Sequence, residues 1–376
     1  MDAEQKPGEV TFSEAEALAR TLTRVGNETL DEPGQAAFDA GSSRGPVTSL
    51  PRIVTRDPEL HLDRSPESRY VVQQRLGEGG MGEVLLVEDR DIQRRVAMKQ
   101  IRAELAEHAP MSIRFTDEVR ALGRLEHPNI VPIYDVGSNV GGQLFFTMKH
   151  VQGETVAALI ERLAAGDSLA HTAWPLARRL DVFSAILEGL AYAHERGVLH
   201  LDIKPENVMI GPHGQVFLMD WGIASLEGET AGGTIAGSPA YMSPEQAAGR
   251  PLDARSDVYS AFIILYELLT LTAYTSAEGS IPAVLAQIQV REAPSLRSPD
   301  YCNPHQPPVP IEHRHFLARG LQLRSEDRYA NAVEALEELH RLRSGDFRVQ
   351  CPLTLAKHMQ VRMNSFLEGH LGMVAA

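Results

Sequence analysis

The sequence predicts an α+β protein with more than one lobe. Its 376 residues, 43% of them apolar and 23% charged, are enough to bury a substantial core. Short β-rich runs separated by turn residues fill the chain from residue 70 to residue 151. Longer stretches with apolar residues at helical spacing follow from residue 176 onward. Strands first and helices second is the order of an α+β fold.

Composition narrows the class of protein. The net charge of −14 argues against nucleic-acid binding, which requires a basic face. The two cysteines, Cys302 and Cys351, cannot form a disulfide framework and fit a reduced intracellular setting. The first ten residues lack the apolar run of a signal peptide, and the longest apolar candidate, residues 258–270, is too short to span a bilayer. These features predict a soluble, cytoplasmic protein without a membrane span.

Residues 1–69 differ in composition from the rest of the chain. They are rich in Glu, Asp, Ser, Pro and Gly and have few large apolar residues, which predicts a largely disordered extension. One short helix is expected within it, with Ser13 as its N-cap and Glu16 completing a capping box. The segment is expected to be a solvated tail, or else a docking segment that binds a partner through an apolar stripe.

Two β-rich runs after residue 70 enclose Gly77, Gly79 and Gly82 in the pattern Gly-x-Gly-x-x-Gly-x-Val. Glycines let a backbone approach phosphate groups closely, because no side chain intervenes. A Rossmann loop would need a helix directly after the glycines, whereas a second strand follows here. The pattern indicates a phosphate-binding hairpin, with a glycine-rich hairpin that binds nothing as the alternative.

The next predicted strand, residues 95–101, places Lys99 where the alternation of side chains points inward. An inward lysine needs an anionic partner. Glu118 lies nineteen residues later in a predicted helix, residues 112–125, on the side that carries its apolar residues. The spacing favours an ion pair between Lys99 and Glu118, and a solvated helix face is the alternative for Glu118.

An amphipathic helix predicted over residues 176–195 leads into a polar loop, residues 200–207, held between apolar flanks. Within this loop Asp202 can accept a proton from a hydroxyl group. Lys204 can neutralise a phosphate, and Asn207 can bind a metal ion. An acid, a base and an amide in so short a loop indicate a catalytic site.

A second carboxylate, Asp220, follows Asn207 by thirteen residues in the sequence Asp-Trp-Gly. Asp-x-Lys-x-x-Asn followed by Asp-aromatic-Gly resembles the catalytic and metal-binding loops of protein kinases. The run Tyr-Met-Ser-Pro-Glu-Gln at residues 241–246 resembles the end of a kinase activation segment and is typical of bacterial serine/threonine kinases. Because seven motifs occur in the family's order and spacing, residues 70–340 resemble the bacterial, eukaryotic-like serine/threonine protein kinase family.

This resemblance implies a bilobal protein kinase-like fold. Residues 70–150 would form a small β-rich lobe and residues 151–340 a large helical lobe, with ATP in the cleft between them. The extension 1–69 precedes this domain and a helical extension, residues 341–376, follows it. A helix predicted over residues 352–369 is expected to pack on the large lobe, with a dimer contact as the alternative.

The resemblance also implies the catalytic roles. Asp202 orients the substrate hydroxyl and takes its proton, and Lys204 steadies the γ-phosphate. Asn207 and Asp220 hold Mg²⁺, with Mn²⁺ as a substitute.

For the nucleotide, the resemblance implies that Lys99, oriented by Glu118, binds the α- and β-phosphates. Met148 would close the back of the adenine pocket, while the carbonyl of Lys149 and the N–H of Val151 read the edge of adenine. The family usually has Glu at the position of Lys149, but the contact uses backbone atoms. The residues implied to contact ATP, with Glu154 at the ribose, are Leu76, Gly77, Glu78, Gly79, Gly80, Met81, Gly82, Val84, Ala97, Lys99, Met148, Lys149, Val151 and Glu154.

The segment after the Asp-Trp-Gly motif is implied to bind a protein substrate. Ser238 would hydrogen-bond the catalytic loop and form part of the platform for an extended peptide. Asp257 would brace the backbone of that loop, and Arg328 would pair with Glu245.

Leu201 is a departure from the family pattern, because an arginine usually precedes the catalytic aspartate and binds a phosphate on the activation segment. A frequent second cation is also replaced, by Ser225. A phosphate at Thr230 or Thr234 would therefore find little to hold it. The alternative is that Arg114 or Arg120, on the helix that carries Glu118, fills the role. Phosphorylation of the segment is therefore expected not to be required for activity.

The resemblance implies a kinase that phosphorylates Ser and Thr of proteins, itself included, in bacterial signal transduction, with docking or dimerisation through the terminal extensions. A pseudokinase scaffold is the first alternative, but it would be expected to have lost Lys99, Asp202 or Asp220. A kinase of small molecules is the second, but it would not need the peptide platform at residues 237–245. Trp221, in place of the usual Phe, fills the same packing role.

Cys302, His305, His313 and His315 form a competing metal-like cluster, since Cys-x-x-His followed by His-x-His can bind zinc. The prolines among these residues indicate an irregular surface loop instead.

Overall fold

The computed structural model describes residues 52–56, 59–63, 69–78, 82–102, 109–139, 142–221, 225–226, 237–275, 280–293, 303–346, 356–357 and 359–360. The chain divides into two compact units. Unit 1 contains the residues up to Val119 together with Pro132–His150, and unit 2 contains Arg120–Val131 and the residues from Val151 onward. Residues 120–131 belong to unit 2, whereas the predicted division placed residues 70–150 together in the small lobe.

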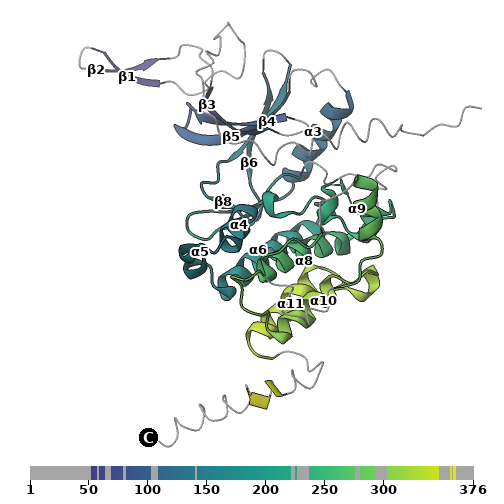
Figure 1. The fold of residues 1–376 in the computed structure, drawn as a ribbon. Coiled ribbons are helices and arrows are strands. Elements are labelled where there is room, and N and C mark those ends of the chain that lie inside the picture. Colours follow the sequence, from purple (N-terminus) through teal and green to yellow (C-terminus); the bar gives the residue numbers. More distant parts are fainter. Residues whose placement is uncertain are drawn as a thin grey trace, which may run out of the picture. The chain divides into compact units, whose positions relative to one another are not determined.

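Unit 1 is built on a five-stranded antiparallel sheet in the order β3-β4-β5-β7-β6 (Figure 1). Its elements are β3 (Tyr70–Glu78), β4 (Gly82–Asp89), β5 (Arg94–Ile101), α3 (Ala109–Leu122), β6 (Ile133–Ser138) and β7 (Leu144–Lys149). Short connections join the paired strands β3 and β4, β4 and β5, and β6 and β7, as expected for hairpins of β-branched and aromatic residues. The helix α3 lies between β5 and β6 in the chain.

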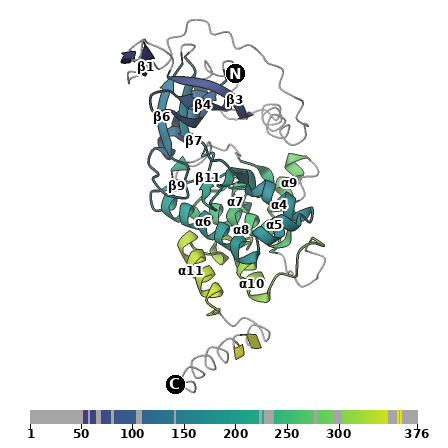
Figure 2. The ribbon, with the colours of Figure 1, turned by 90° about the vertical axis from the view of Figure 1, so that its left-hand side faces the viewer.

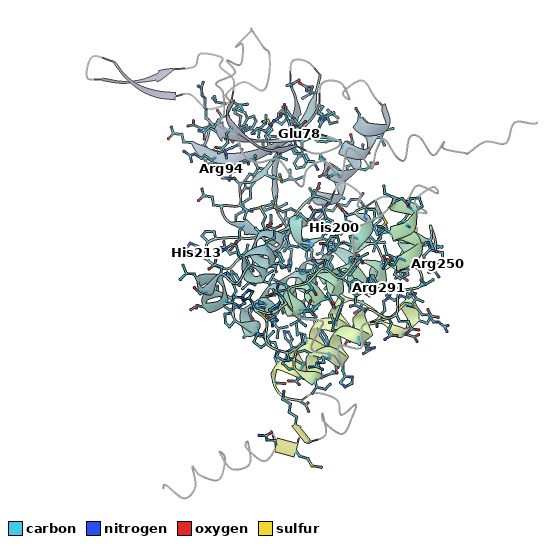
Figure 3. All side chains as sticks on the ribbon, viewed as in Figure 1. Glu78, Arg94, His200, His213, Arg250 and Arg291 are labelled. Carbon is cyan, nitrogen blue, oxygen red and sulfur yellow. The ribbon has the colours of Figure 1, made fainter. Side chains whose placement is uncertain are left out.

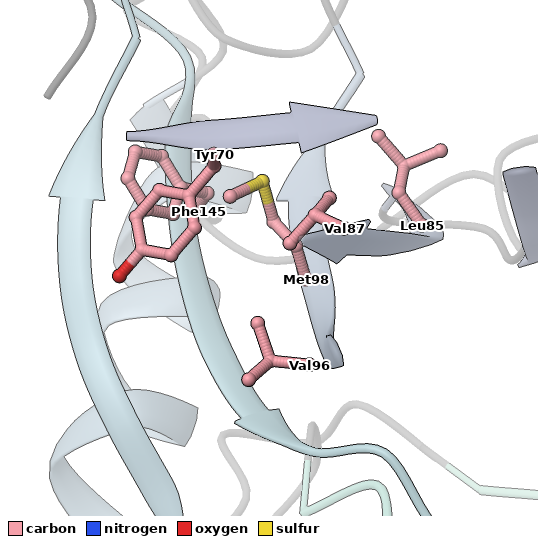
Figure 4. Close-up of a cluster of buried hydrophobic side chains, with 6 residues drawn as sticks. All are labelled: Tyr70, Leu85, Val87, Val96, Met98 and Phe145. Atoms are coloured by element: carbon pink, nitrogen blue, oxygen red, sulfur yellow. The ribbon is translucent and has the colours of Figure 1, made fainter. Parts of the chain in front are cut away.

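One face of this sheet buries six apolar side chains, which Figure 4 shows together: Tyr70, Leu85, Val87, Val96, Met98 and Phe145. The rings of Tyr70 and Phe145 meet edge to face with centroids 5.8 Å apart. The other face buries Phe146, which contacts Phe115 of α3 with centroids 5.4 Å apart. The alternation of side chains along β5 and β7 thus divides the core of unit 1 between two faces.

The helix α3 begins and ends three residues earlier than the predicted 112–125. The chain turns at its end, where Arg124 N–H donates to the carbonyl of Ala121 and Leu125 N–H to that of Leu122. Sequence periodicity missed this boundary because Leu125 is buried and continues the apolar pattern past the last helical turn.

The extension before residue 70, predicted to be largely disordered, contains two strands that the structure describes. Strands β1 (Arg52–Arg56) and β2 (Glu59–Asp63) pair in an antiparallel hairpin. The β-branched run in β1 favours a strand. The amino-acid composition averaged over residues 1–69 does not reveal so short a segment. The predicted helix after Ser13 lies outside the described residues.

Unit 2 is mainly helical (Figure 2). Its helices are α4 (Val156–Ala164), α5 (Ser168–Ala173), α6 (Leu176–His194), α7 (Pro244–Ala247), α8 (Ala254–Thr270), α9 (Ile281–Ile288), α10 (Ile311–Gly320) and α11 (Ala332–Arg343). Its short strands are β8 (Glu154–Thr155), β9 (Val198–Leu199), β10 (Val208–Ile210), β11 (Val216–Leu218) and β12 (Ser225–Leu226). The expected helix 176–195 is α6, and the expected α+β class is confirmed.

The helix α8 forms the centre of unit 2 and lies beside α6 (Figure 2). Its residues from Ser256 to Thr270 are all buried, including the carboxyl groups of Asp257 and Glu267. Phe262 of α8 packs against Phe183 of α6 and Phe316 of α10, with ring centroids 5.1 and 5.0 Å apart. This rigid core supports the loops that follow β9 and β11.

The last helix of the predicted domain, α11, runs to Arg343 and so crosses the predicted boundary at residue 340. Beyond it, residues 356–357 and 359–360 are helical, and Lys357 pairs with Glu312 of α10. Most of the predicted helix 352–369 lies outside the described residues. Among the helices that the structure describes, none has the length and apolar content needed to cross a bilayer.

Candidate active site

In unit 1 the glycine-rich motif lies where β3 turns into β4, so a second strand follows it and not a helix. Gly77 pairs with Val84 across this hairpin. A Cβ on Gly82 would come within 2.2 Å of the carbonyl oxygen of Gln100. Only glycine fits at this position, because β4 approaches β5 so closely here. A Cβ on Gly77 would meet no described atom within 4 Å. Gly79, Gly80 and Met81 lie outside the described residues.

The ion pair that the spacing favours is present in unit 1. Lys99 Nζ lies 2.7 Å from Glu118 Oε1, and the two side chains are only 11% and 1% exposed. Lys99 stands between Val84 on β4 and Phe146 on β7, so its position in the middle of the sheet is fixed by two ladders. A buried ammonium group held this way can bind a further anion without losing its orientation.

The strand β7 ends at the residues expected to read adenine. Met148 and Val151 are buried. The N–H of Lys149 donates to the carbonyl of Pro132 over 3.2 Å. Glu154, predicted to reach a ribose, accepts at both carboxylate oxygens from Arg162 over 3.0 Å.

In unit 2 the backbone of the polar loop after β9 is hydrogen-bonded to Asp257, which is fully buried at the start of α8. Its carboxylate accepts from the N–H groups of His200 and Leu201, each over 2.8 Å, and lies 2.9 Å from His194 Nε2. Burial by itself would raise the pKa of Asp257, but the hydrogen bond to His194 and the backbone donors outweigh it and hold the pKa below its usual value. An ionised carboxylate therefore fixes the start of the loop, as the resemblance implied.

His200, labelled in Figure 3, is buried. Its ring lies against that of Trp221, with centroids 4.4 Å apart. Its Nε2 lies 3.0 Å from the carbonyl oxygen of Met219. Burial lowers the pKa of His200, so the ring is neutral and joins the loop to the end of β11. Trp221 thus fills an apolar packing position.

The carboxylate of Asp202 is held at both oxygens. Oδ1 accepts from the N–H of Ser238 over 2.8 Å. Oδ2 accepts from Asn207 Nδ2 over 3.1 Å and lies 3.1 Å from Lys204 Nζ. Lys204 Nζ also donates to Ser238 Oγ over 2.7 Å. The structure therefore brings together Asp202, Lys204, Asn207 and Ser238, three from the loop and one from thirty-odd residues later in the chain.

Asn207 and Asp220 fit a site for Mg²⁺ by the chemistry of their side chains. Asn207 directs its amide nitrogen to Asp202, so its amide oxygen is the atom that can coordinate a metal. The backbone of Asn207 accepts from Met219 N–H over 2.9 Å, which connects the loop to the residue before Asp220. Asp220 is exposed and has a φ of 59°, a left-handed conformation that aspartate tolerates. Carboxylate and amide oxygens are the ligands that Mg²⁺ prefers.

The competing zinc cluster is not assembled in the part of the chain that the structure describes, where no group of three His, Cys, Asp or Glu is placed to hold a metal. His313 and His315 lie on α10, and Cys302 lies outside the described residues.

The predicted pair between Glu245 and Arg328 is present and buried. Its two hydrogen bonds measure 2.7 and 2.9 Å, and Ser256 Oγ donates to the same carboxylate over 2.8 Å. Burial by itself would raise the pKa of Glu245, but the hydrogen bonds and charge of Arg328 outweigh it and hold the pKa below its usual value. The carboxyl group is therefore ionised. The pair connects α7 to the segment before α11.

The start of the segment after Trp221 is anchored as a strand. β12 pairs antiparallel with β9, with Ser225 opposite Leu199 and Leu226 opposite Val198. Thr230 and Thr234, the predicted phosphorylation sites, lie outside the described residues.

Sequence reasoning missed Gln246, whose Nε2 donates to the carbonyl of Leu201 over 2.8 Å. Ser243 and Gln246 form a capping box at the start of α7, and the pattern Ser-x-x-Gln was the only local signal. Such a pattern predicts a helix start, but not the contact of its side chain with a loop 45 residues away.

Comparison with known proteins agrees with this geometry. Residues 70–340 match the family described as the protein kinase domain. Serine/threonine-protein kinase PknD of Protochlamydia amoebophila is 33% identical over 300 residues, covering 73% of this chain and 30% of that protein. Serine/threonine-protein kinase PknB of Mycolicibacterium smegmatis is 34% identical over 287 residues, covering 74% of this chain and 43% of that protein.

Among solved structures, the PknI kinase domain of M. tuberculosis aligns with a TM-score of 0.54 and 26% identity, covering 73% of this chain and 95% of that one. The chain spans less than half the length of the two curated relatives.

Proposed function

The chain belongs to the protein kinase domain family, and we propose that it transfers the γ-phosphoryl group of ATP to serine and threonine hydroxyl groups of proteins. The observation that carries this proposal is the arrangement around Asp202, whose carboxylate is oriented by the backbone of Ser238 and by Asn207 while Lys204 lies beside it. A carboxylate held this way can orient a hydroxyl group and accept its proton.

In the proposed reaction, the hydroxyl oxygen of the acceptor attacks the γ-phosphorus of ATP. The bond from that phosphorus to the β–γ bridging oxygen breaks, ADP leaves, and the hydroxyl proton passes to Asp202. Lys204 stabilises the negative charge on the transferred group. When bound, Mg²⁺ would be held by Asn207 and Asp220 and would neutralise phosphate charge.

The residues that the resemblance implies to contact ATP are proposed to hold the nucleotide. Lys99, kept in place by Glu118, binds its α- and β-phosphates, and the backbone at Lys149 and Val151 reads adenine. Lys99, Asp202 and Asp220 are all present, which supports catalysis over a scaffold role. Acceptor specificity for Ser and Thr is inferred from the motif around Lys204 and from the names of the relatives.

We place the activity in bacterial signal transduction, because the relatives are bacterial serine/threonine kinases. ATP as substrate and two cysteines in a chain of this length fit a reducing cytoplasm.

The test is incubation of the purified protein with γ-labelled ATP and Mg²⁺, followed by mapping of the labelled residues. We expect label on Ser and Thr, and a loss of about a hundredfold or more in Lys99→Met and Asp220→Asn, because each removes a group that stabilises phosphate charge. Lys357→Met is the matched control, since its lysine pairs with Glu312 on α10 and takes no part in the site. Equal labelling of wild type, Lys99→Met and Asp220→Asn would refute the assignment.

A further inference from the structure

Leu201, the residue before Asp202, has a backbone that is held on both sides. Its N–H donates to Asp257 over 2.8 Å, and its carbonyl accepts from Gln246 Nε2 over 2.8 Å. Its φ of 63° is the left-handed conformation, which costs a leucine energy and persists only where neighbours enforce it. Because this peptide leads directly into Asp202, its orientation sets the direction of the catalytic carboxylate.

Gln246 is itself held in one orientation. It is buried in α7, its Oε1 accepts from the N–H of Ser243 over 3.4 Å, and its own N–H donates to Ser243 Oγ over 3.2 Å. With its oxygen directed to Ser243, the amide presents its nitrogen to the Leu201 carbonyl. The capping box of α7 thus fixes the orientation of the Gln246 donor independently of its contact with Leu201.

The segment that supplies Ser238 passes close to the same hydrogen bond. Gly237 has a φ of 119°, and a Cβ there would come within 3.0 Å of the Leu201 carbonyl oxygen and 3.1 Å of Gln246 Nε2. The next residue, Ser238, donates its N–H to Asp202. The Gln246 amide therefore joins α7 to the catalytic loop, and Gly237, next to Ser238, lies beside this contact.

We propose that Gln246 is a positioning residue for Asp202, and that its hydrogen bond to Leu201 orders the catalytic loop without a phosphate. The inference rests on the proposed kinase function. An arginine at position 201 would order the loop only after a phosphate arrives, whereas the amide of Gln246 is present in the unmodified chain. Leu201, which has no side-chain donor, packs into the core instead.

The test replaces the donor with an acceptor of the same size. Gln246→Glu keeps the size of the side chain and the acceptor for Ser243, but places an oxygen opposite the Leu201 carbonyl. We expect kcat to fall by about thirtyfold to a hundredfold, as misplacement of a catalytic group by about 1 Å produces. KM for ATP should change by less than about twofold, since uniform nucleotide binding is not involved.

A second readout distinguishes positioning from loss of structure. A buried carboxyl at position 246 can donate again once protonated, so the ratio of variant to wild-type kcat should rise as the pH falls. Gln246→Met has no donor at any pH and should show no such recovery. Gln289→Glu is the matched control, because Gln289 Nε2 donates to the carbonyl of Ala247 over 3.1 Å, beside α7 but not to the loop. It should keep wild-type kcat.

Hydrogen exchange tests the inference independently of activity. Amides of residues 198–204 should exchange about tenfold faster in Gln246→Glu than in wild type or Gln289→Glu, because the loop loses a restraint. If the wild type transferred no phosphate, the proposed function would fail and this comparison would still decide the role of Gln246. Unchanged exchange, or kcat within about threefold of wild type in Gln246→Glu, would overturn the inference.

Discussion

Among single residues, Glu267 of α8 shows how burial changes the chemistry of a carboxyl group. It is 7% exposed, its Oε2 accepts from the hydroxyl of Tyr241, and its Oε1 accepts from the N–H of Tyr274. These are neutral donors. Burial raises the pKa of Glu267 to about 7, and the nearby charge of Glu206 adds to this rise. The group therefore titrates near neutral pH beneath the segment that is proposed to bind substrate.

This shift predicts a pH dependence of stability. The unfolded chain releases the proton near the ordinary value of 4.5, whereas the folded protein keeps it until about pH 7. Stability is therefore lost as the pH rises through this window, by up to about 3 kcal/mol. Urea unfolding of wild type and Glu267→Gln at several pH values between 4.5 and 8 should show this slope only in the wild type. Glu337→Gln, at an exposed position of α11, should keep the wild-type slope.

Among elements, α7 is attached to the rest of unit 2 by the buried pair of Glu245 and Arg328. Every hydrogen-bonding nitrogen of this guanidinium has a partner, since Nε donates to the carbonyl of Gln322 and Nη2 also donates to that of Leu323. The Arg328 side chain is fully buried and lies over the ring of Tyr259. Complete pairing is what makes a buried charge tolerable.

Removal of one member of this pair should therefore cost more than removal of both charges. Arg328→Met leaves a buried carboxylate without its partner and is expected to lower the free energy of unfolding by about 3–5 kcal/mol. The double variant Glu245→Gln, Arg328→Met should recover part of this loss, because no charge stays buried. Denaturant unfolding measures both. A double variant less stable than Arg328→Met would contradict this account.

The segment between β12 and Gly237 carries the predicted phosphorylation sites. We expect the double variant Thr230→Ala, Thr234→Ala to phosphorylate an exogenous substrate at close to the wild-type rate, because Leu201 has no side-chain donor for a phosphate and its backbone already has partners. A fall in turnover of about a hundredfold, as loss of an ordering contact would produce, would contradict this and implicate another cation.

For the whole molecule, the match to the protein kinase domain family begins at Tyr70, next to Arg69. This guanidinium lies 2.9 Å from Asp89 and 2.9 Å from Asp135, and the Tyr70 hydroxyl donates to Asp135 over 2.8 Å. The hydrogen bond to Asp89 raises the pKa of Arg69, so the charge is permanent. These contacts join the start of β3 to β4 and β6, which are separated in the sheet order by two strands.

A protein shortened to start at Ser65 should therefore unfold cooperatively and phosphorylate a generic acceptor such as casein, although it lacks the hairpin β1–β2. A protein that starts at Val71 loses Arg69 and Tyr70 and should be less stable by about 2–5 kcal/mol, since Asp89 and Asp135 lose partners at partly buried positions. Thermal unfolding of both checks this. Loss of cooperative unfolding in the longer of the two would show that the extension is part of the fold.

The sequence by itself determined the features that depend on short-range patterns. Alternation along β5 placed Lys99 inside, helical spacing placed Glu118 on the core side of α3, and the two occur as a pair. The order of acid, base and amide in residues 200–207 indicated the chemistry that is proposed for the loop. Periods of two and 3.6 residues are set by the backbone, so they can be read without knowing the fold.

Only the tertiary structure decided which distant groups meet. Nothing local indicates that Gln246 reaches Leu201, or that Glu267 lies under Tyr241 with a raised pKa. The left-handed backbone of Leu201 is likewise enforced by partners 45 and 56 residues away. Hydrogen bonds and desolvation act between atoms that packing brings within a few ångströms, and that packing depends on the whole chain. For this reason the sequence indicated candidate residues for the chemistry, and the fold decided what holds them in place.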